Sequence, residues 1–304
     1  MSAGDPSAPA MAHWLATMAA WRRWFTYTVE GMEHLRTHEC KFVVGYHGRP
    51  LAWDLFLLGA EIHREQGYLP LALVHRNFMN WPYLRWLTEG LVWSTGKGPI
   101  LDQAIANGRH VILAPGGVQE GLRPGWVRYQ VDWPGLGYLR LAISRGIAVV
   151  PVAASGVDDA FFGLNDNARA KRRLGIKSPD RAVWAGLGPL GMWPSSPPFP
   201  VRVHQIIGAP VVPVIPKQDR SALLNDHDEL QALHERVQAR VQELLDRARE
   251  TACGTARFDL NRPPIGPRVD RLRAWLGRVG ELDLKPEIEL LPWQTQRNKP
   301  PAGR

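Results

Sequence analysis

Short stretches rich in β-branched and aromatic residues alternate with helix-compatible segments through most of this 304-residue chain. Seven stretches have the length of strands, and they cover residues 25–29, 42–46, 69–74, 91–94, 111–114, 148–153 and 201–207. Helix-compatible segments lie between most of them, at residues 51–64, 82–88, 99–106 and 135–144. This alternation predicts an α/β layered fold with a mixed, largely parallel sheet of about seven strands flanked by helices.

The two ends of the chain differ from this central pattern. Residues 11–25 predict an amphipathic helix with tryptophans on its apolar face, which suits either a membrane interface or packing on the core. A long helix over residues 226–249 closes the alternating region, and an Arg- and Pro-rich stretch follows it. We therefore expect an N-terminal helix (1–25), a central domain (26–250) and a C-terminal tail (251–304).

Charge and composition narrow the partners and the compartment. The net charge of +8 favours an anionic partner: acidic lipid headgroups, a nucleotide-bearing substrate or nucleic acid. No nucleic-acid-binding module is recognisable. Two cysteines provide neither a disulfide framework nor a cysteine-based zinc cluster. No signal peptide is visible at the start, and the longest uncharged stretch, residues 182–201, is broken by Gly and Pro. We expect a soluble or peripherally bound cytoplasmic protein.

A histidine follows the predicted strand 42–46 in the sequence Tyr-His-Gly-Arg-Pro-Leu-Ala-Trp-Asp. Gly48 and Pro50 make a helix unfavourable before Leu51, so the loop that carries His47 can fold back over the helix start. Asp54, one turn inside that helix, could then hold the imidazole of His47 as a general base is held. A turn or packing role for His47 is the alternative.

A second feature is the segment Ala-Pro-Gly-Gly-Val-Gln-Glu-Gly, residues 114–121, which follows the predicted strand 111–114. Gly116 and Gly117 allow backbone amides to approach a ligand closely, although a Gly-Gly pair also makes an ordinary tight turn. Other chemistries are not supported. The glycines near Lys97 are wrongly spaced for a phosphate loop, His234 lacks the second histidine of a zinc protease motif, and no nucleophile elbow is present.

Residues 137–142 and 148–153 follow these two segments. In the order and spacing of all these segments, the chain resembles the glycerolipid and lysophospholipid acyltransferase family. The Pro-Gly-Gly form is closest to its branch of diacylglycerol acyltransferases. The resemblance spans about residues 26–250 and implies an αβ acyltransferase fold. In the family four residues separate the histidine from its aspartate, whereas six separate His47 from Asp54 here.

The resemblance implies an O-acyltransferase that moves a fatty acyl group to a hydroxyl of a glycerolipid or lysophospholipid. The donor would be acyl-CoA or acyl-carrier protein, with no other cofactor and no metal. His47 would be the general base, and Asp54 would orient it. Arg49, Lys97, Gly116, Gly117, Gln119 and Glu120 are the expected substrate-binding residues.

Some of these assignments have alternatives. Gln119 stands where much of the family has a phosphate-binding arginine, so Arg123 or Arg128 would have to replace it, or the acceptor is a neutral alcohol. Arg49 and Lys97 also suit ordinary surface positions. The longer His–Asp spacing and the missing arginine motivate the rival hypothesis of a non-catalytic lipid-binding protein.

The composition also predicts a membrane partner. Residues 11–25 and 182–201 are rich in apolar side chains and carry few charges, within a strongly basic chain. We expect both to dock on the anionic inner face of the cell membrane, with Trp14, Trp21 and Trp193 inserted.

Overall fold

The structure is a computed structural model that describes residues 2–3, 5–75, 85–96, 98–178 and 181–255. These residues form one compact unit, within residues 1–257, around an eight-stranded sheet. The strands of this sheet are β1 (Ser2–Ala3), β2 (Thr28–Glu30), β3 (Lys41–Gly45), β4 (Leu71–Leu73), β5 (Val92–Ser94), β6 (Val111–Leu113), β7 (Ala148–Ser155) and β11 (His204–Ile207). The predicted tail lies almost entirely outside the described residues.

The strand order is β1-β5-β4-β6-β3-β7-β11-β2, and β3 lies near the middle. The five neighbouring pairs β5–β4, β4–β6, β6–β3, β3–β7 and β11–β2 are parallel, whereas β1–β5 and β7–β11 are antiparallel. The predicted mixed, largely parallel sheet is therefore confirmed. The added eighth strand is the two-residue β1.

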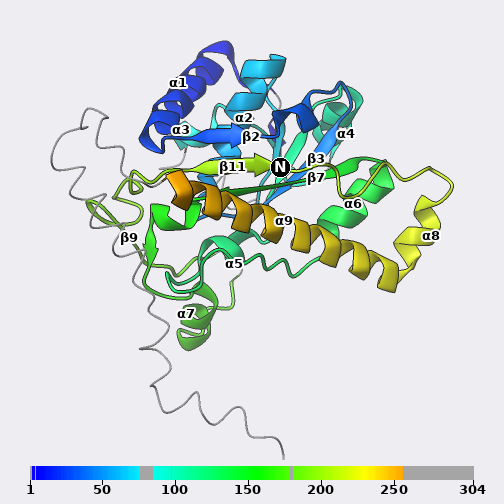
Figure 1. Cartoon of the computed structure of the whole chain (residues 1–304). Coiled ribbons are helices and arrows are strands. Elements are labelled where there is room, and N and C mark those ends of the chain that lie inside the picture. The colour runs from blue at the N-terminus through cyan, green and yellow to red at the C-terminus, as the bar shows by residue number, and fades with distance from the viewer. Residues whose placement is uncertain (1, 4, 76–84, 97, 179–180, 256–304) are drawn as a thin grey trace, which may run out of the picture. The chain divides into compact units, whose positions relative to one another are not determined.

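Helices and short 3₁₀ turns connect the strands and cover both faces of the sheet. The α-helices are α1 (Ala8–Trp24), α2 (Trp53–Gln66), α3 (Arg85–Thr88), α4 (Pro99–Ala106), α5 (Gly117–Gly121), α6 (Gly137–Arg145), α7 (Asn167–Arg173), α8 (Arg220–Asn225) and α9 (His227–Thr255). Two 3₁₀ turns used below are η1 (Met32–Leu35) and η4 (Val157–Ala160). Figure 1 shows α9 crossing β7 and β11, while α2 lies on the other side of the sheet.

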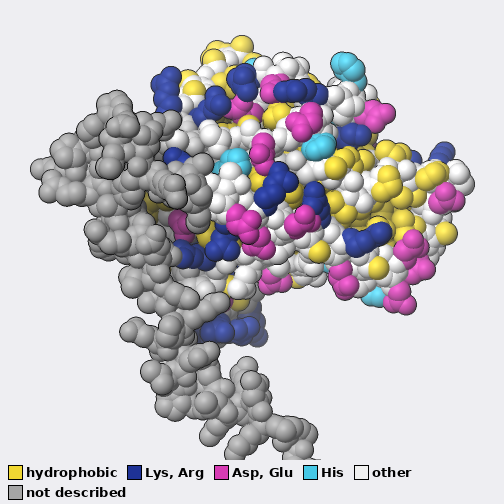
Figure 2. Space-filling view, in the orientation of Figure 1, with side chains coloured by type: hydrophobic (Ala, Val, Ile, Leu, Met, Phe, Trp, Pro, Cys, Tyr) yellow, Lys and Arg dark blue, Asp and Glu magenta, His cyan; other side chains and the backbone are white. Residues whose placement is uncertain are grey.

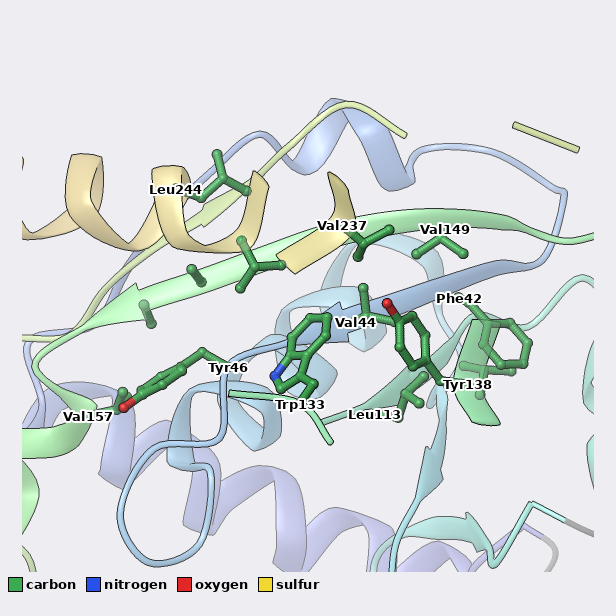
Figure 3. Close-up of a cluster of buried hydrophobic side chains, with 14 of the residues drawn as sticks. Phe42, Val44, Tyr46, Leu113, Trp133, Tyr138, Val149, Val157, Val237 and Leu244 are labelled. Carbon is green, nitrogen blue, oxygen red and sulfur yellow. The ribbon is translucent and has the colours of Figure 1, made fainter. Parts of the chain in front are cut away.

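Alternate side chains of the central strands enter two cores. On one face, Val43 and its neighbours pack against α2 and η1. On the other, Phe42 and Val44 belong to a larger core that includes Val237 and Leu244 of α9, as Figure 3 shows. Central strands of a parallel sheet are buried on both faces, which is why they appear in the sequence as continuous apolar runs.

A second, smaller sheet contains three short strands in the order β10-β9-β8. They are β8 (Phe162–Gly163), β9 (Gly186–Gly188) and β10 (Gly191–Met192), and helix α7 lies in the connection from β8 to β9. The sequence pattern does not predict this sheet, because its strands contain only two or three residues each and include four glycines.

The tryptophans expected to insert into a membrane have other positions. Trp14 is 1% exposed and belongs to the core, and Trp21 packs on Trp53 with ring centroids 4.9 Å apart. Trp193 is half-buried and meets Phe161 edge-on at 5.6 Å. The expectation that Trp14 and Trp21 insert is therefore wrong, because the apolar face of α1 covers the protein's own core. Insertion of Trp193 stays a prediction. None of the described helices is long and apolar enough to cross a membrane.

Candidate functional site

His47 lies directly after the buried end of β3, in the loop that leads to α2. Its side chain is half-buried and lines an apolar pocket. The ring Nδ1 is 2.9 Å from the carbonyl oxygen of Gly48. When Nδ1 carries the proton and donates it to this carbonyl, Nε2 keeps its lone pair, as a general base requires.

The electrostatic surroundings favour the neutral imidazole. Burial lowers the pKa of His47, and the hydrogen bond to the Gly48 carbonyl opposes this only in part. His47 is therefore neutral, and able to accept a proton, at neutral pH.

Glu120, in α5, is buried beneath the His47 loop. Its Oε2 accepts hydrogen bonds from the backbone N–H of His47 at 2.9 Å and from the indole of Trp133 at 3.2 Å. Its Oε1 accepts from the backbone of Asp132 at 3.1 Å and lies 3.6 Å from Nη2 of Arg123. Burial raises the pKa of Glu120 to about 8, although these donors pull it down in part. Glu120 is absent from the pocket wall.

Two glycines permit this close packing. A Cβ on Gly121 would lie 2.4 Å from Nδ1 of His47, and a Cβ on Gly116 would lie 2.3 Å from Oε2 of Glu120. A side chain at either position would displace the imidazole or the carboxyl group. Steric packing therefore explains why glycine stands at both positions, whereas the sequence predicts a ligand contact for Gly116.

Asp54 does not form the expected hydrogen bond with His47. It is fully buried in the first turn of α2, where its Oδ2 faces Nε2 of Gln205 at 3.5 Å and its Oδ1 has no hydrogen-bond partner among the described residues. The phenol of Tyr27 donates to Oε1 of Gln205 at 2.5 Å, which fixes that amide. Burial raises the pKa of Asp54 to about 8, although amides of the first helical turn lower it in part. The imidazole is instead oriented by the carbonyl of Gly48.

The reason lies in the chain between the two residues. Helix α2 begins at Trp53 rather than Leu51, after Ala52 adopts a left-handed conformation with φ of 46°. The amide of Ala52 bonds back to the carbonyl of Gly48 at 3.2 Å, so the loop closes on itself. Asp54 then faces Gln205 of β11.

Arg49 is 1% exposed, so the predicted contact with a substrate phosphate is wrong. Its guanidinium donates to the carbonyls of Pro124 at 2.8 Å, Asp158 at 3.3 Å and Val127. Its Nε lies 3.9 Å from the Asp158 carboxylate. Arg49 therefore attaches the His47 loop to residues 124–127 and to η4.

Three predicted substrate-binding residues remain, together with the two arginines considered as replacements. Gly117 lines the pocket, whereas Gln119 is exposed and lies outside its wall. Lys97 lies outside the described residues. The two arginines considered as replacements for a phosphate ligand are both engaged: Arg123 donates to the Gln130 carbonyl at 2.6 Å, and Arg128 pairs with Asp159 at 2.7 Å.

The pocket has a volume of about 360 Å³, in the range of small-ligand sites, and its wall is mainly apolar. It extends from His47 along α2 to Gly59, Trp14 and Pro70. Several wall residues that the sequence did not predict come from distant segments: Val118, Leu122, Ala182, Trp184, Trp193 and Pro194. Their tryptophans were visible in the sequence, but no local pattern assigned them to a pocket. Among the described residues, no cluster of His, Cys, Asp or Glu could hold a metal ion.

No family model matches this chain. A Bos taurus protein named "DGAT1/2-independent enzyme synthesizing storage lipids" is 24% identical over 234 residues, which are 74% of this chain and 65% of the relative. The protein of the same name from Gallus gallus is 25% identical over 241 residues, or 73% of this chain and 68% of its own length. The chain thus spans about two thirds of the length of these curated relatives.

Among solved structures, the chain is similar to PlsC, the 1-acyl-sn-glycerophosphate (LPA) acyltransferase from Thermotoga maritima. The TM-score is 0.45 and the identity 18%, over 77% of this chain and 79% of that one. The two relatives named for the synthesis of storage lipids agree with the resemblance to glycerolipid acyltransferases that the sequence motifs predict.

Proposed function

We propose that this protein is an acyltransferase that moves a fatty acyl group from a thioester to a hydroxyl of a glycerolipid or lysophospholipid. The observation that supports this most strongly is a neutral His47 at an apolar pocket of about 360 Å³. The similarity to relatives named for storage-lipid synthesis agrees with it. The proposed donor is acyl-CoA or acyl-carrier protein, and the proposed location is the inner face of the cell membrane.

In the proposed reaction, Nε2 of His47 removes the proton from the acceptor hydroxyl as its oxygen attacks the thioester carbonyl. The tetrahedral intermediate collapses with cleavage of the carbon–sulfur bond, and the imidazolium returns the proton to the departing thiolate. The Gly48 carbonyl, which accepts from Nδ1, orients the ring and stabilises its positive charge. The acyl chain lies in the apolar pocket.

The test is acyl transfer by the purified chain from acyl-CoA and from acyl-carrier protein to lysophospholipid, monoacylglycerol and diacylglycerol. His47→Ala should reduce turnover by about 10² to 10⁴. Gly121→Ala should also reduce it strongly, because the added methyl would displace the imidazole. Gly137→Ala is the matched control, since no atom lies within 4 Å of the Cβ position there. Full turnover by His47→Ala would show that the base is another residue.

The absence of a His47–Asp54 hydrogen bond supports a second candidate function, that of a non-catalytic lipid-binding protein on the same fold. Such a protein would bind fatty acyl chains in the pocket without turnover for any donor and acceptor pair. Lipid binding measured beside the transfer assay separates the two functions.

A further inference from the structure

The small sheet presents a row of large apolar side chains to solvent. Leu187 of β9 lies directly opposite both Phe162 of β8 and Met192 of β10. Directly opposed residues in a sheet project from the same face. Phe162, Leu187 and Met192 are neighbouring apolar side chains, yet they are 38%, 41% and 41% exposed.

Glycines fix the opposite face of this sheet against the protein. Gly163, Gly186 and Gly188 are buried. A Cβ at these positions would lie between 2.2 and 2.4 Å from the Arg123 carbonyl, the Trp184 ring and the Ser196 hydroxyl. The sheet therefore cannot turn its apolar row inward, and the exposure of that row is built into the fold.

Further apolar side chains extend this surface. Leu190, in the turn between β9 and β10, is 80% exposed, and Leu164 continues β8 beside Ala185 through a 2.8 Å backbone hydrogen bond. We call Phe162, Leu164, Leu187, Leu190 and Met192 the apolar ledge. Clusters of this kind are uncommon on a soluble surface unless something covers them.

Basic residues lie in the same segment of the chain as the apolar ledge. Residues 162–192 contain six Lys and Arg and two Asp, a net charge of +4 within a chain of net charge +8. Four of the basic residues lie on α7, and Arg169, Arg172 and Arg173 are exposed without an ion-pair partner among the described residues. Asn167 of α7 accepts a 2.8 Å hydrogen bond from the backbone of Val183, which precedes β9, and Figure 2 shows Lys and Arg side chains over α7.

The same segment forms part of the pocket. Ala182 and Trp184 precede β9, Trp193 and Pro194 follow β10, and all four residues line the pocket that contains His47. The apolar ledge therefore lies on the outer side of the segment whose inner side bounds the candidate site.

We propose that the apolar ledge and the basic residues of α7 form a docking surface for an anionic lipid bilayer. The apolar side chains enter the interface while the arginines meet acidic headgroups. Lipid then passes from the bilayer to the adjoining pocket. This transfer rests on the proposed function, whereas docking does not.

The test is flotation of the full chain with vesicles of phosphatidylcholine alone or mixed with phosphatidylglycerol. Binding should require the anionic lipid, and it should weaken without vanishing as salt rises, because salt screens charges but leaves apolar insertion intact. Leu190→Asp should reduce binding at least tenfold, and Arg172→Gln should reduce it about fivefold. Val214→Asp and Arg236→Gln are the matched controls, on an exposed apolar residue and an exposed α9 arginine outside the ledge.

Thermal midpoints and acyl transfer with detergent-dispersed acceptor accompany each binding measurement. A folded Leu190→Asp variant that keeps transfer but loses vesicle binding supports docking. Equal binding by Leu190→Asp and Val214→Asp would overturn it, as would a concentration-dependent dimer abolished by Leu190→Asp, because a second copy would then cover the ledge. Normal vesicle binding without any transfer by the unaltered chain would contradict the proposed function and leave docking intact.

Discussion

The backbone amide of His47 donates a 2.9 Å hydrogen bond to the carboxyl group of Glu120, 73 residues further along the chain. On the proposed function, Glu120 is therefore a positioning residue for the His47 loop. It joins the loop after β3 to α5, so the position of the imidazole depends on a residue from another strand connection.

Glu120→Gln should disturb this position because a carboxyl group offers two accepting oxygens and an amide offers one. At least one N–H among the three donors would lose its acceptor, at a cost of about 1–3 kcal/mol in unfolding free energy. Displacement of His47 should lower kcat more than it raises KM. Urea unfolding and steady-state kinetics measure both effects. Glu235→Gln, at an exposed site on α9, is the control, and parallel losses in the two variants would contradict the positioning role.

The buried carboxyl group of Asp54 should make the stability depend on pH. Its pKa is raised to about 8 in the folded protein, from 3.8 in an exposed chain. Between these values the folded state keeps a proton that the unfolded state releases, so stability falls as pH rises from about 4 to about 8. The slope has an upper limit of about 1.4 kcal/mol per pH unit for each such group, and Glu120 contributes with the same sign.

Asp54→Asn should therefore flatten the decline in stability between pH 5 and pH 8. Unfolding by urea across this range measures the change. Asp228→Asn removes an exposed carboxylate and should leave the slope as it is. Identical slopes for Asp54→Asn and the unaltered protein would mean that Asp54 is ionised in the fold.

If the pocket holds the acyl chain, as the proposed function requires, Gly59 should set the length of chain that it accepts. It lines the pocket, and a Cβ there would lie 3.6 Å from Pro70 and 3.7 Å from the Trp14 ring, an ordinary contact distance. Gly59→Ala should therefore be tolerated. Gly59→Leu should fill the far end and lower kcat/KM for long acyl donors about 10- to 200-fold relative to short ones. An unchanged preference in a folded Gly59→Leu variant would place the acyl chain elsewhere.

The sequence by itself determined the layered α/β fold and the position of the histidine. Buried parallel strands require continuous apolar runs and the helices between them require a different period, so both are visible locally. The predicted strand 42–46 corresponds to β3, and helix 99–106 matches α4 at both ends. His47 lies in the connection from β3 to α2, where Gly48 and Pro50 interrupt both the strand and the helix pattern.

Only the tertiary structure decided what each polar side chain contacts. Asp54 faces Gln205, 151 residues away, and Arg49 is enclosed by carbonyls of residues 124, 127 and 158. Such partners depend on which strands become neighbours and on one left-handed residue, Ala52, at the start of α2. Periodicity reports whether a residue is buried, but a hydrogen bond requires two groups to meet within a few tenths of an ångström. For groups far apart in the chain, the packing of the whole fold sets that distance.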